Sequence, residues 1–186
     1  MSAPRTLIVL AHPNLSGSRA NAAMVQAVAD LDNVTVHDLY ATYPDFRIHV
    51  EHEQQLIREH DRVVFQFPFQ WYGAPALLKQ WMDTVLTMGF AFTFDGSPSE
   101  MRGKQVQLAV TVGNNEESYT AEGLNRATVE QLLLPVQRSF EMCQVDHQGA
   151  FALHGLMLGT VSDEDLALHT KRYRKALAGG ENPAQA

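Results

Sequence analysis

The sequence predicts an α/β protein whose parallel sheet is covered by helices on both faces. Short apolar runs alternate about five times with longer segments of helical periodicity. The runs at 6–11 and 63–67 are apolar on both faces apart from Gln66, which is typical of strands buried on both sides. Alternation of buried strands with helices indicates a parallel sheet. We expect one domain over residues 1–178 and a frayed tail without function over 179–186.

The strands are predicted from short runs rich in β-branched and aromatic residues. Four of them have clear limits, and the fifth is placed only within a range. A bend or bulge is expected after the fifth strand, at Gly155. The expected strands lie at 6–11, 34–37, 63–67, 105–112 and somewhere between 149 and 158.

The helices are predicted from apolar residues at helical spacing and from their end signals. Pro75 suits the first position of the third helix, and Pro135 predicts a kink or two pieces in the fourth. Ser162 followed by Asp165 resembles a capping box and predicts the start of the last helix. The expected helices lie at 18–30, 49–60, 75–87, 124–142 and 162–177.

Composition excludes several functional classes. The formal charge of -7 argues against a general binder of nucleic acid or of anionic membranes, which would need a basic surface. The single cysteine, Cys143, excludes an intrachain disulfide and is expected in the core. The first apolar run is too short for a signal-peptide core, and no run approaches the roughly 20 residues that cross a bilayer. We expect a cytoplasmic protein.

Histidine spacing does not favour a metal site. His49 and His52 are three residues apart on an expected helix, which could place them on one face. Without a third ligand of matching geometry a zinc site is improbable, so no metal ligands are assigned. G-x-S-x-G is also absent, which disfavours a hydrolase of that type.

Ligands of parallel α/β sheets bind at the carboxyl ends of the strands, so the segments after the strands carry the functional signal. After the first strand, Ser18 and Asn21 offer short polar side chains and Arg19 offers a fork for a phosphate. The helix that begins there adds free backbone N–H groups. Neither the dinucleotide fingerprint nor the Walker loop is present. The alternative is a plain loop in which Ser18 caps the helix, and spacing alone slightly favours it.

Three aromatic residues and a glutamine follow the third strand between two prolines. The prolines stiffen this segment and Gly73 allows a tight bend. A flat heterocycle could stack on the rings and be hydrogen-bonded by Gln70. The alternative is a satellite core in which Trp71 and Tyr72 pack under the loop. The segment connects a strand to a helix, which favours a ligand.

The segment after the fourth strand, Thr111-Val112-Gly113-Asn114, can approach a ligand edge closely. Gly113 and Asn114 both tolerate positive φ. Tyr119, further along, is a candidate proton donor or hydrogen-bond partner. Three loops of this kind at one edge of a sheet indicate a binding site more strongly than any one of them does.

Together these segments resemble those of the flavodoxin-like NAD(P)H:quinone oxidoreductases. The resemblance is carried by His12-Pro13, Ser18-Arg19-Ala20-Asn21, Pro68-Phe69-Gln70-Trp71-Tyr72 and Thr111-Val112-Gly113-Asn114. It runs from Thr6 to about Tyr173, and the Pro-x-Gln-Trp-Tyr element is its most specific part. Within the family the chain looks most like the bacterial ancillary proteins of glutathione-regulated potassium-efflux systems.

The resemblance implies a flavodoxin-like sheet of order 2-1-3-4-5 and a homodimer with the site at its interface. It also implies a bound flavin, for which FMN is favoured over FAD. It implies ping-pong hydride transfer, in which NAD(P)H reduces the flavin and a quinone then takes its place. His12 and Ser18, Arg19, Ala20 and Asn21 would hold the phosphate and ribityl chain. The isoalloxazine ring would be lined by Pro68, Phe69, Gln70, Trp71 and Tyr72 and closed over by Thr111, Val112, Gly113 and Asn114.

Two departures from the family pattern affect the chemistry. Tyr119 stands where larger animal members have a tyrosine that helps shift charge from the reduced flavin, but Asn125 stands at the position of their histidine. Asparagine can form hydrogen bonds but cannot titrate, so a proton relay through that pair is in doubt. Gly113-Asn114 replaces the usual Gly-Gly, at a small conformational cost.

A second function comes from a different class. The chain could serve chiefly as a regulatory subunit of a potassium-efflux antiporter, held at the inner face of the membrane by that partner. The flavin would then be a structural or redox-sensing group. A negligible rate with flavin fully bound would favour regulation over catalysis.

Overall fold

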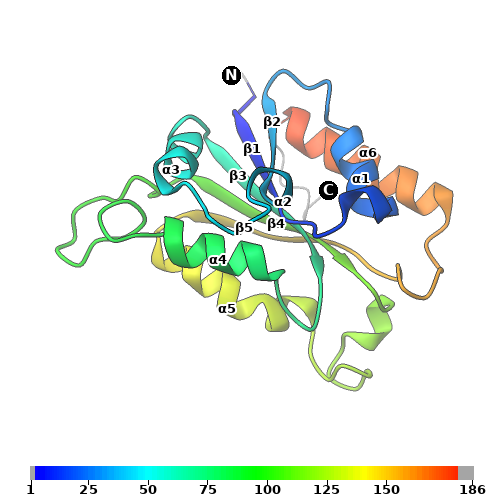
Figure 1. The fold of residues 1–186 in the computed structure, drawn as a ribbon. Helices are drawn as coiled ribbons and strands as arrows, with labels where there is room; N and C mark the ends of the chain where they lie inside the picture. Colours follow the sequence, from blue (N-terminus) through cyan, green and yellow to red (C-terminus); the bar gives the residue numbers. More distant parts are fainter. Residues whose placement is uncertain (1–2, 180–186) are drawn as a thin grey trace.

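The computed structural model describes residues 3–179, which form one parallel sheet of five strands in the order β2-β1-β3-β4-β5 (Figure 1). Both the fold class and the expected strand order are therefore confirmed. The three central strands are almost wholly buried, whereas the edge strands β2 and β5 are mostly half-buried. The strands are β1 (Thr6–Leu10), β2 (Val34–Asp38), β3 (Arg62–Phe69), β4 (Gln105–Val112) and β5 (Asp146–Leu153).

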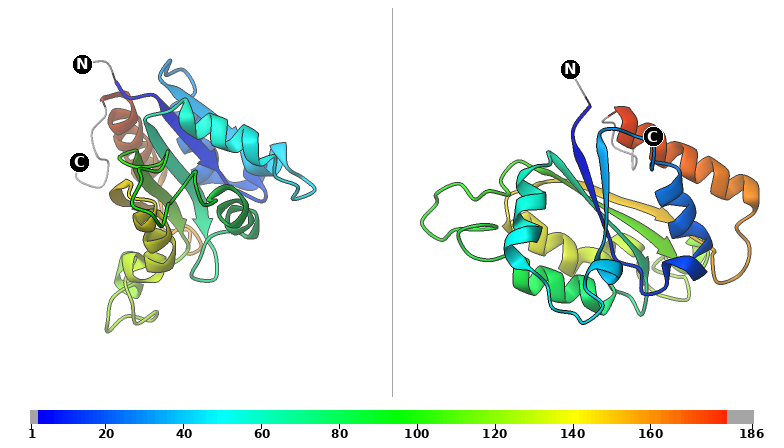
Figure 2. Two further views of the ribbon diagram at one scale, coloured as in Figure 1. Left: turned by 90° about the vertical axis from the view of Figure 1, so that its left-hand side faces the viewer. Right: turned by 45° about the horizontal axis from the view of Figure 1, so that its top comes forward.

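Helices cover both faces of the sheet, as the two further views show (Figure 2). α1 and α6 lie against each other on one face, and α3, α4 and α5 lie on the other. The helices are α1 (Arg19–Gln26), α2 (Leu39–Thr42), α3 (Val50–Arg58), α4 (Ala76–Val85), α5 (Val129–Met142) and α6 (Asp163–Gly179). Short 3-10 helices lie at Leu15–Gly17 and Glu116–Ser118.

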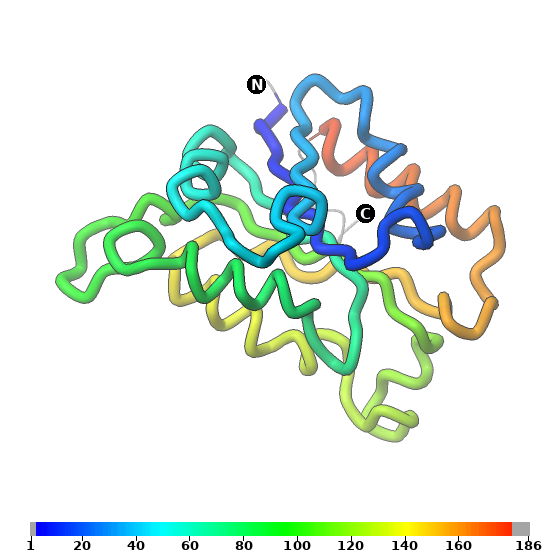
Figure 3. Tube along the Cα trace, viewed as in Figure 1, coloured from blue at the N-terminus to red at the C-terminus, as the bar shows by residue number. Residues whose placement is uncertain are grey.

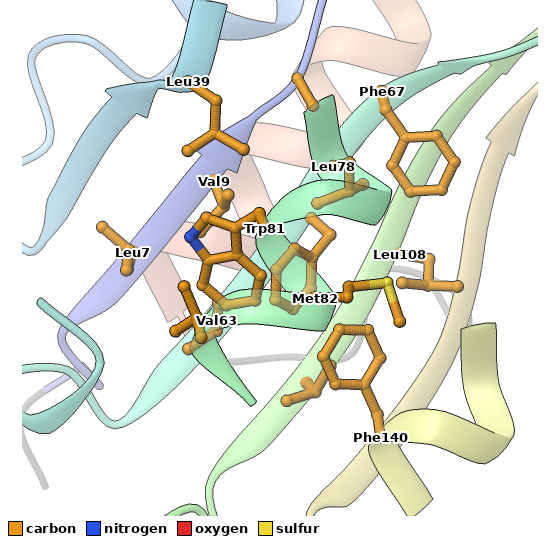
Figure 4. Packing of buried hydrophobic residues seen from close by; sticks show 14 of the residues in the cluster. Leu7, Val9, Leu39, Val63, Phe67, Leu78, Trp81, Met82, Leu108 and Phe140 are labelled. Atoms are coloured by element: carbon orange, nitrogen blue, oxygen red, sulfur yellow. The ribbon is translucent and has the colours of Figure 1, made fainter. Parts of the chain in front are cut away.

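The core divides between the two faces because successive side chains of a strand point in opposite directions. Leu7 and Val9 of β1 pack with the α3–α4–α5 layer, while Ile8 and Leu10 pack with α1 and α6. Figure 4 shows the fully buried Trp81 of α4 in the larger of these two clusters. The expectation that Cys143 belongs to the core holds, since it is buried in the same cluster.

The one polar residue inside the third apolar run has a structural role. Gln66 is fully buried and donates from Nε2 to the backbone oxygen of Asn21 at 3.1 Å and to its Oδ1 at 3.2 Å. Its Oε1 accepts from the Tyr173 hydroxyl at 3.1 Å, and Asn21 Nδ2 donates to Thr111 Oγ1 at 2.9 Å. Burying these groups is tolerated because each has a partner. The network ties α1 and α6 to the middle of the sheet.

The helix expected over 124–142 begins later and is not divided. α5 starts at Val129, where Thr128 and Gln131 form a reciprocal capping box. Arg126 has a φ of 52°, a left-handed conformation that interrupts a helix. The helix continues through Pro135, so the alternative of two pieces is wrong.

Other limits differ by a few residues. α1 ends at Gln26 instead of residue 30, and β5 begins at Asp146 instead of after residue 148. α2 was not expected; the side chain of Asp38 caps its four residues. At the end of the chain, Gly179 still belongs to α6, and the rest of the expected tail, 180–186, lies outside the described residues.

Candidate functional site

The loops that follow β1, β3, β4 and β5 lie near one another at the carboxyl edge of the sheet (Figure 3). Between them are two open cavities of about 490 and 600 Å³. Phe69, Gln70, Gly113 and Met157 line both, so the cavities are parts of one hollow. We call the smaller the loop-1 cavity, because the loop after β1 forms much of its wall, and the larger the aromatic cavity, because it contains Phe69, Trp71, Tyr72 and Tyr119.

The loop-1 cavity presents hydrogen-bond donors. His12 lies on its wall and accepts at Nδ1 from the backbone N–H of Asn14 at 3.1 Å. The neutral ring therefore carries its proton on Nε2. Burial lowers the pKa of His12, against an opposing effect of Asp38, so the neutral form is favoured near pH 7. The start of α1 adds the backbone of Arg19 and Ala20 to the same wall.

Ser18 and Arg19 already have partners within the protein. Ser18 Oγ accepts from the N–H of Asn21 at 3.2 Å, so the helix-cap interpretation of Ser18 is confirmed. The Arg19 guanidinium donates to the Val161 carbonyl at 2.8 Å and to Asp163 at 2.6 Å. The Arg19 guanidinium, which was expected to bind a phosphate, is thus hydrogen-bonded to residues at the start of α6. Both residues still line the loop-1 cavity.

Asn21 is the predicted residue that lies outside both cavity walls. It is buried, and its side-chain amide is used by Gln66 and Thr111. The sequence pattern placed it correctly in the loop–helix segment but could not show which way the side chain points. Its role in this structure is to hold that segment against β3 and β4.

A tight turn after β3 projects two aromatic side chains. Backbone hydrogen bonds join Gln70 and Gly73 in both directions, at 3.1 and 3.0 Å. The central residues, Trp71 and Tyr72, have φ values of 47° and 63°, a left-handed pair that normally favours Asn and Gly. Gly73, expected to provide the bend, has no positive φ. Aromatic residues held in a costly conformation indicate a functional constraint on the turn.

Trp71 is 96% exposed and Tyr72 is 51% exposed. The alternative of a satellite core beneath the loop is therefore wrong. Trp71 stands at the rim of the aromatic cavity with its indole available to a ligand.

Polar side chains of Tyr72, Asn125 and Tyr119 form part of the wall of the aromatic cavity. The Tyr72 hydroxyl donates to Asn125 Oδ1 at 3.0 Å, which joins the β3–α4 turn to the loop before α5. Asn125 Nδ2 is buried with no hydrogen-bond partner among the described residues. Burial, with a smaller effect of Tyr72, raises the pKa of Tyr119, which therefore remains protonated at neutral pH. The wall thus offers two phenols and an amide.

His154 was not expected at the site. It follows β5, and its ring lies 5.8 Å from that of Tyr119 between centroids. Burial lowers its pKa, partly offset by nearby Glu116, Glu130 and Glu117. The fold therefore places a histidine from another loop, His154, beside Tyr119. Asn125 stands where the larger animal members of the family have their histidine, and it lines the aromatic cavity.

Gly113 packs closely against the side chain of Met157. Neither Gly113 nor Asn114 has a positive φ, so the expected conformational reason is wrong. A Cβ at Gly113 would instead lie 3.2 Å from Cβ of Met157, which lines both cavities. Leu156 and Met157 were missed, although they also follow a strand and the same carboxyl-edge rule applies to them. Asn14 and Gly17 of the first loop were missed as well.

Comparisons with known proteins identify the family of the chain. The model of a family described as having a flavodoxin-like fold matches residues 4–177. The chain is 46% identical over 142 residues to the glutathione-regulated potassium-efflux system ancillary protein KefG of Pectobacterium atrosepticum, covering 76% of each chain. None of the helices between residues 3 and 179 is long and apolar enough to cross a membrane.

Two solved structures are similar over nearly the whole chain. General stress protein 14 of Treponema denticola, in complex with FMN, has a TM-score of 0.86 and 37% identity, covering 94% of this chain and 98% of that one. A protein described as an NADPH-quinone reductase from P. pentosaceus has a TM-score of 0.83 and 30% identity, with coverage of 94% and 98%. The chain belongs to the flavodoxin-like NAD(P)H oxidoreductase family.

Proposed function

We propose that the protein is an FMN-dependent NAD(P)H:quinone oxidoreductase. The observation that carries the proposal is that the loop-1 cavity, which presents hydrogen-bond donors, and the aromatic cavity share wall residues and form one hollow. A flavin nucleotide has a matching division into a polar phosphate end and a flat ring. The FMN complex of a relative at 37% identity supports the same cofactor here.

The residues present fit FMN. The phosphate and ribityl chain would be held by His12 Nε2, by the start of α1 and by the polar atoms of Ser18 and Thr111. Gly113 and Met157 form a closely packed part of the wall, where a Cβ added at Gly113 would crowd the Met157 side chain. The ring would extend along Phe69 and Gln70 toward Trp71.

Bound FMN would supply hydride acceptance and donation at N5, with NAD(P)H and a quinone using the site in turn. The chain's own residues would bind and orient these flat substrates. The aromatic side chains of the larger cavity provide stacking surfaces for them. Tyr119, protonated at neutral pH, would donate a hydrogen bond from its hydroxyl to an acceptor oxygen.

Tyr119→Phe is expected to lower kcat by roughly 10- to 150-fold while leaving FMN content unchanged. The change removes one hydroxyl donor to an oxygen that gains negative charge, and a hydrogen bond of that kind contributes roughly 1.5–3 kcal/mol. Steady-state quinone reduction and the flavin absorbance of the purified variant would be measured together. Unchanged turnover and unchanged flavin content would leave Tyr119 a packing residue.

We also propose a homodimer with the site at its interface. Two large apolar side chains that line the hollow, Trp71 and Met157, are exposed. A second copy would cover them and complete the walls. Sedimentation of the FMN-loaded chain at the rate of a monomer would contradict this.

The test of the proposed function is the visible spectrum of protein loaded with FMN and freed of excess, before and after anaerobic NADPH. Flavin bands that bleach with NADPH and return when a quinone is added are expected. Protein that retains no flavin would contradict the cofactor assignment.

The similarity to KefG favours a second candidate, a regulatory subunit of a potassium-efflux antiporter, held at the inner membrane face by that partner. Bands that persist in NADPH, with flavin fully bound, would support this candidate over catalysis.

A further inference from the structure

Two imidazoles and a buried carboxylate meet where β2 faces α3, away from the walls of both cavities. His37 lies on the edge strand β2, while His52 and Glu53 lie in the first turn of α3. The rings of His37 and His52 are 5.9 Å apart between centroids. The sequence offered only the pair His49 and His52; in the fold, His52 lies together with His37 and Glu53.

The carboxylate of Glu53 is held in place from two sides. Oε1 accepts from the Tyr43 hydroxyl at 2.5 Å and from Nε2 of His37 at 2.8 Å, and Oε2 accepts from Nε1 of Trp81 at 2.7 Å. Burial would raise the pKa of Glu53, but the hydrogen bonds from His37, Tyr43 and Trp81 together outweigh it and lower the pKa. The site therefore contains an oriented anion at neutral pH.

The distances allow one ion to reach three ligands. One ligand atom from each of His37, His52 and Glu53 lies within 4.8 Å of the other two. Small side-chain rotations would bring these atoms to the separations that ligands of one Zn²⁺ have. His52 is exposed and gives an entry path from solvent, whereas Glu53 is almost fully buried.

We propose that His37, His52 and Glu53 form a binding site for a divalent transition-metal ion such as Zn²⁺. Two imidazoles and one carboxylate suit zinc, with water completing the coordination. Tyr43 and Trp81 orient the ligating carboxylate by hydrogen bonds, as outer groups do in metal sites. The site is independent of the proposed redox function.

Metal binding requires one proton to change position. Nε2 of His37 gives up the proton that it donates to Glu53, and the neutral ring carries its proton on Nδ1 instead. Metal–ligand bonds from both residues replace that single hydrogen bond. The ion would then join β2 to α3, so zinc should raise the melting temperature of the protein.

The experiment is a calorimetric titration of the untagged, chelator-treated chain with Zn²⁺ alone. Wild-type protein is expected to bind one ion per chain, and His52→Ala to bind it at least about tenfold more weakly. The His52 ring makes no hydrogen bond to any described residue, so this variant should fold with unchanged melting temperature in the absence of zinc. Zinc should stabilise the wild type and not the variant.

His49→Asn is the matched control. His49 is also exposed, but its Nδ1 accepts from the backbone N–H of His52 as the cap of α3, a function that Asn can perform. Its zinc affinity should equal that of the wild type. Wild-type protein that binds no zinc, equal affinity in His52→Ala, or loss of binding in His49→Asn alone would overturn the proposed ligand set.

Discussion

Replacement of Glu53 by alanine is expected to lower the free energy of unfolding by about 3–5 kcal/mol. The carboxylate is buried and accepts hydrogen bonds from Tyr43, His37 and Trp81, which come from three separate segments. Its removal leaves the Tyr43 hydroxyl and the Trp81 indole N–H buried without an acceptor. Each such donor costs roughly 1–3 kcal/mol, and the lost packing adds to this. Chemical denaturation in the presence of a chelator would measure the difference.

Glu51→Ala is the matched control, since Glu51 lies in the same helical turn and its side chain is 86% exposed. It should cost less than about 1 kcal/mol, through the helix dipole and the exposed contact of Glu51 with His49. The difference between wild type and Glu53→Ala should also shrink on acidification. The pKa of Glu53 is lowered in the folded state, so its stabilisation is complete above the ordinary glutamate pKa and is lost as pH falls through the lowered value. A difference that is no larger than that of Glu51→Ala would contradict the argument.

The sheet could be predicted because its central strands are short, mainly apolar runs rich in β-branched and aromatic residues. β1, β3 and β4 fall almost where these runs lie. Local patterns failed where a side-chain contact or a single backbone angle decides the outcome. The capping box at Thr128 and the left-handed Arg126 set the start of α5, and the side chain of Asp38 allows the four-residue α2. None of these features has a helical period.

The position of the site could be predicted because ligand loops follow parallel strands, a rule of topology. The directions of its side chains could not. The side chain of Asn21, in α1, points into the core because Gln66 of β3 and Thr111 of β4 form hydrogen bonds with it. His154 reaches Tyr119 from the loop after β5. Such pairings depend on contacts across the sheet, which the spacing of residues along one segment does not contain.

Trp71→Ala is expected to weaken FMN binding by about 1–3 kcal/mol, which is roughly a 5- to 150-fold rise in Kd. The indole is 96% exposed at the rim of the aromatic cavity, so it contributes little to the folded chain. A stacked flavin ring would cover it, and that contact exists only in the complex. Fluorescence titration of apoprotein with FMN would give Kd, and thermal unfolding of the apoprotein should change little.

Phe94→Ala is a matched control, because Phe94 is 79% exposed and lines neither cavity among the described residues. Its FMN affinity should equal that of the wild type. Trp71→Phe should retain most of the affinity, since a smaller aromatic face remains for stacking. If Trp71→Ala binds FMN as tightly as the wild type, the strained turn at Trp71 and Tyr72 does not serve the flavin. Its exposed rings would then be available to a flat substrate or to a second copy of the chain.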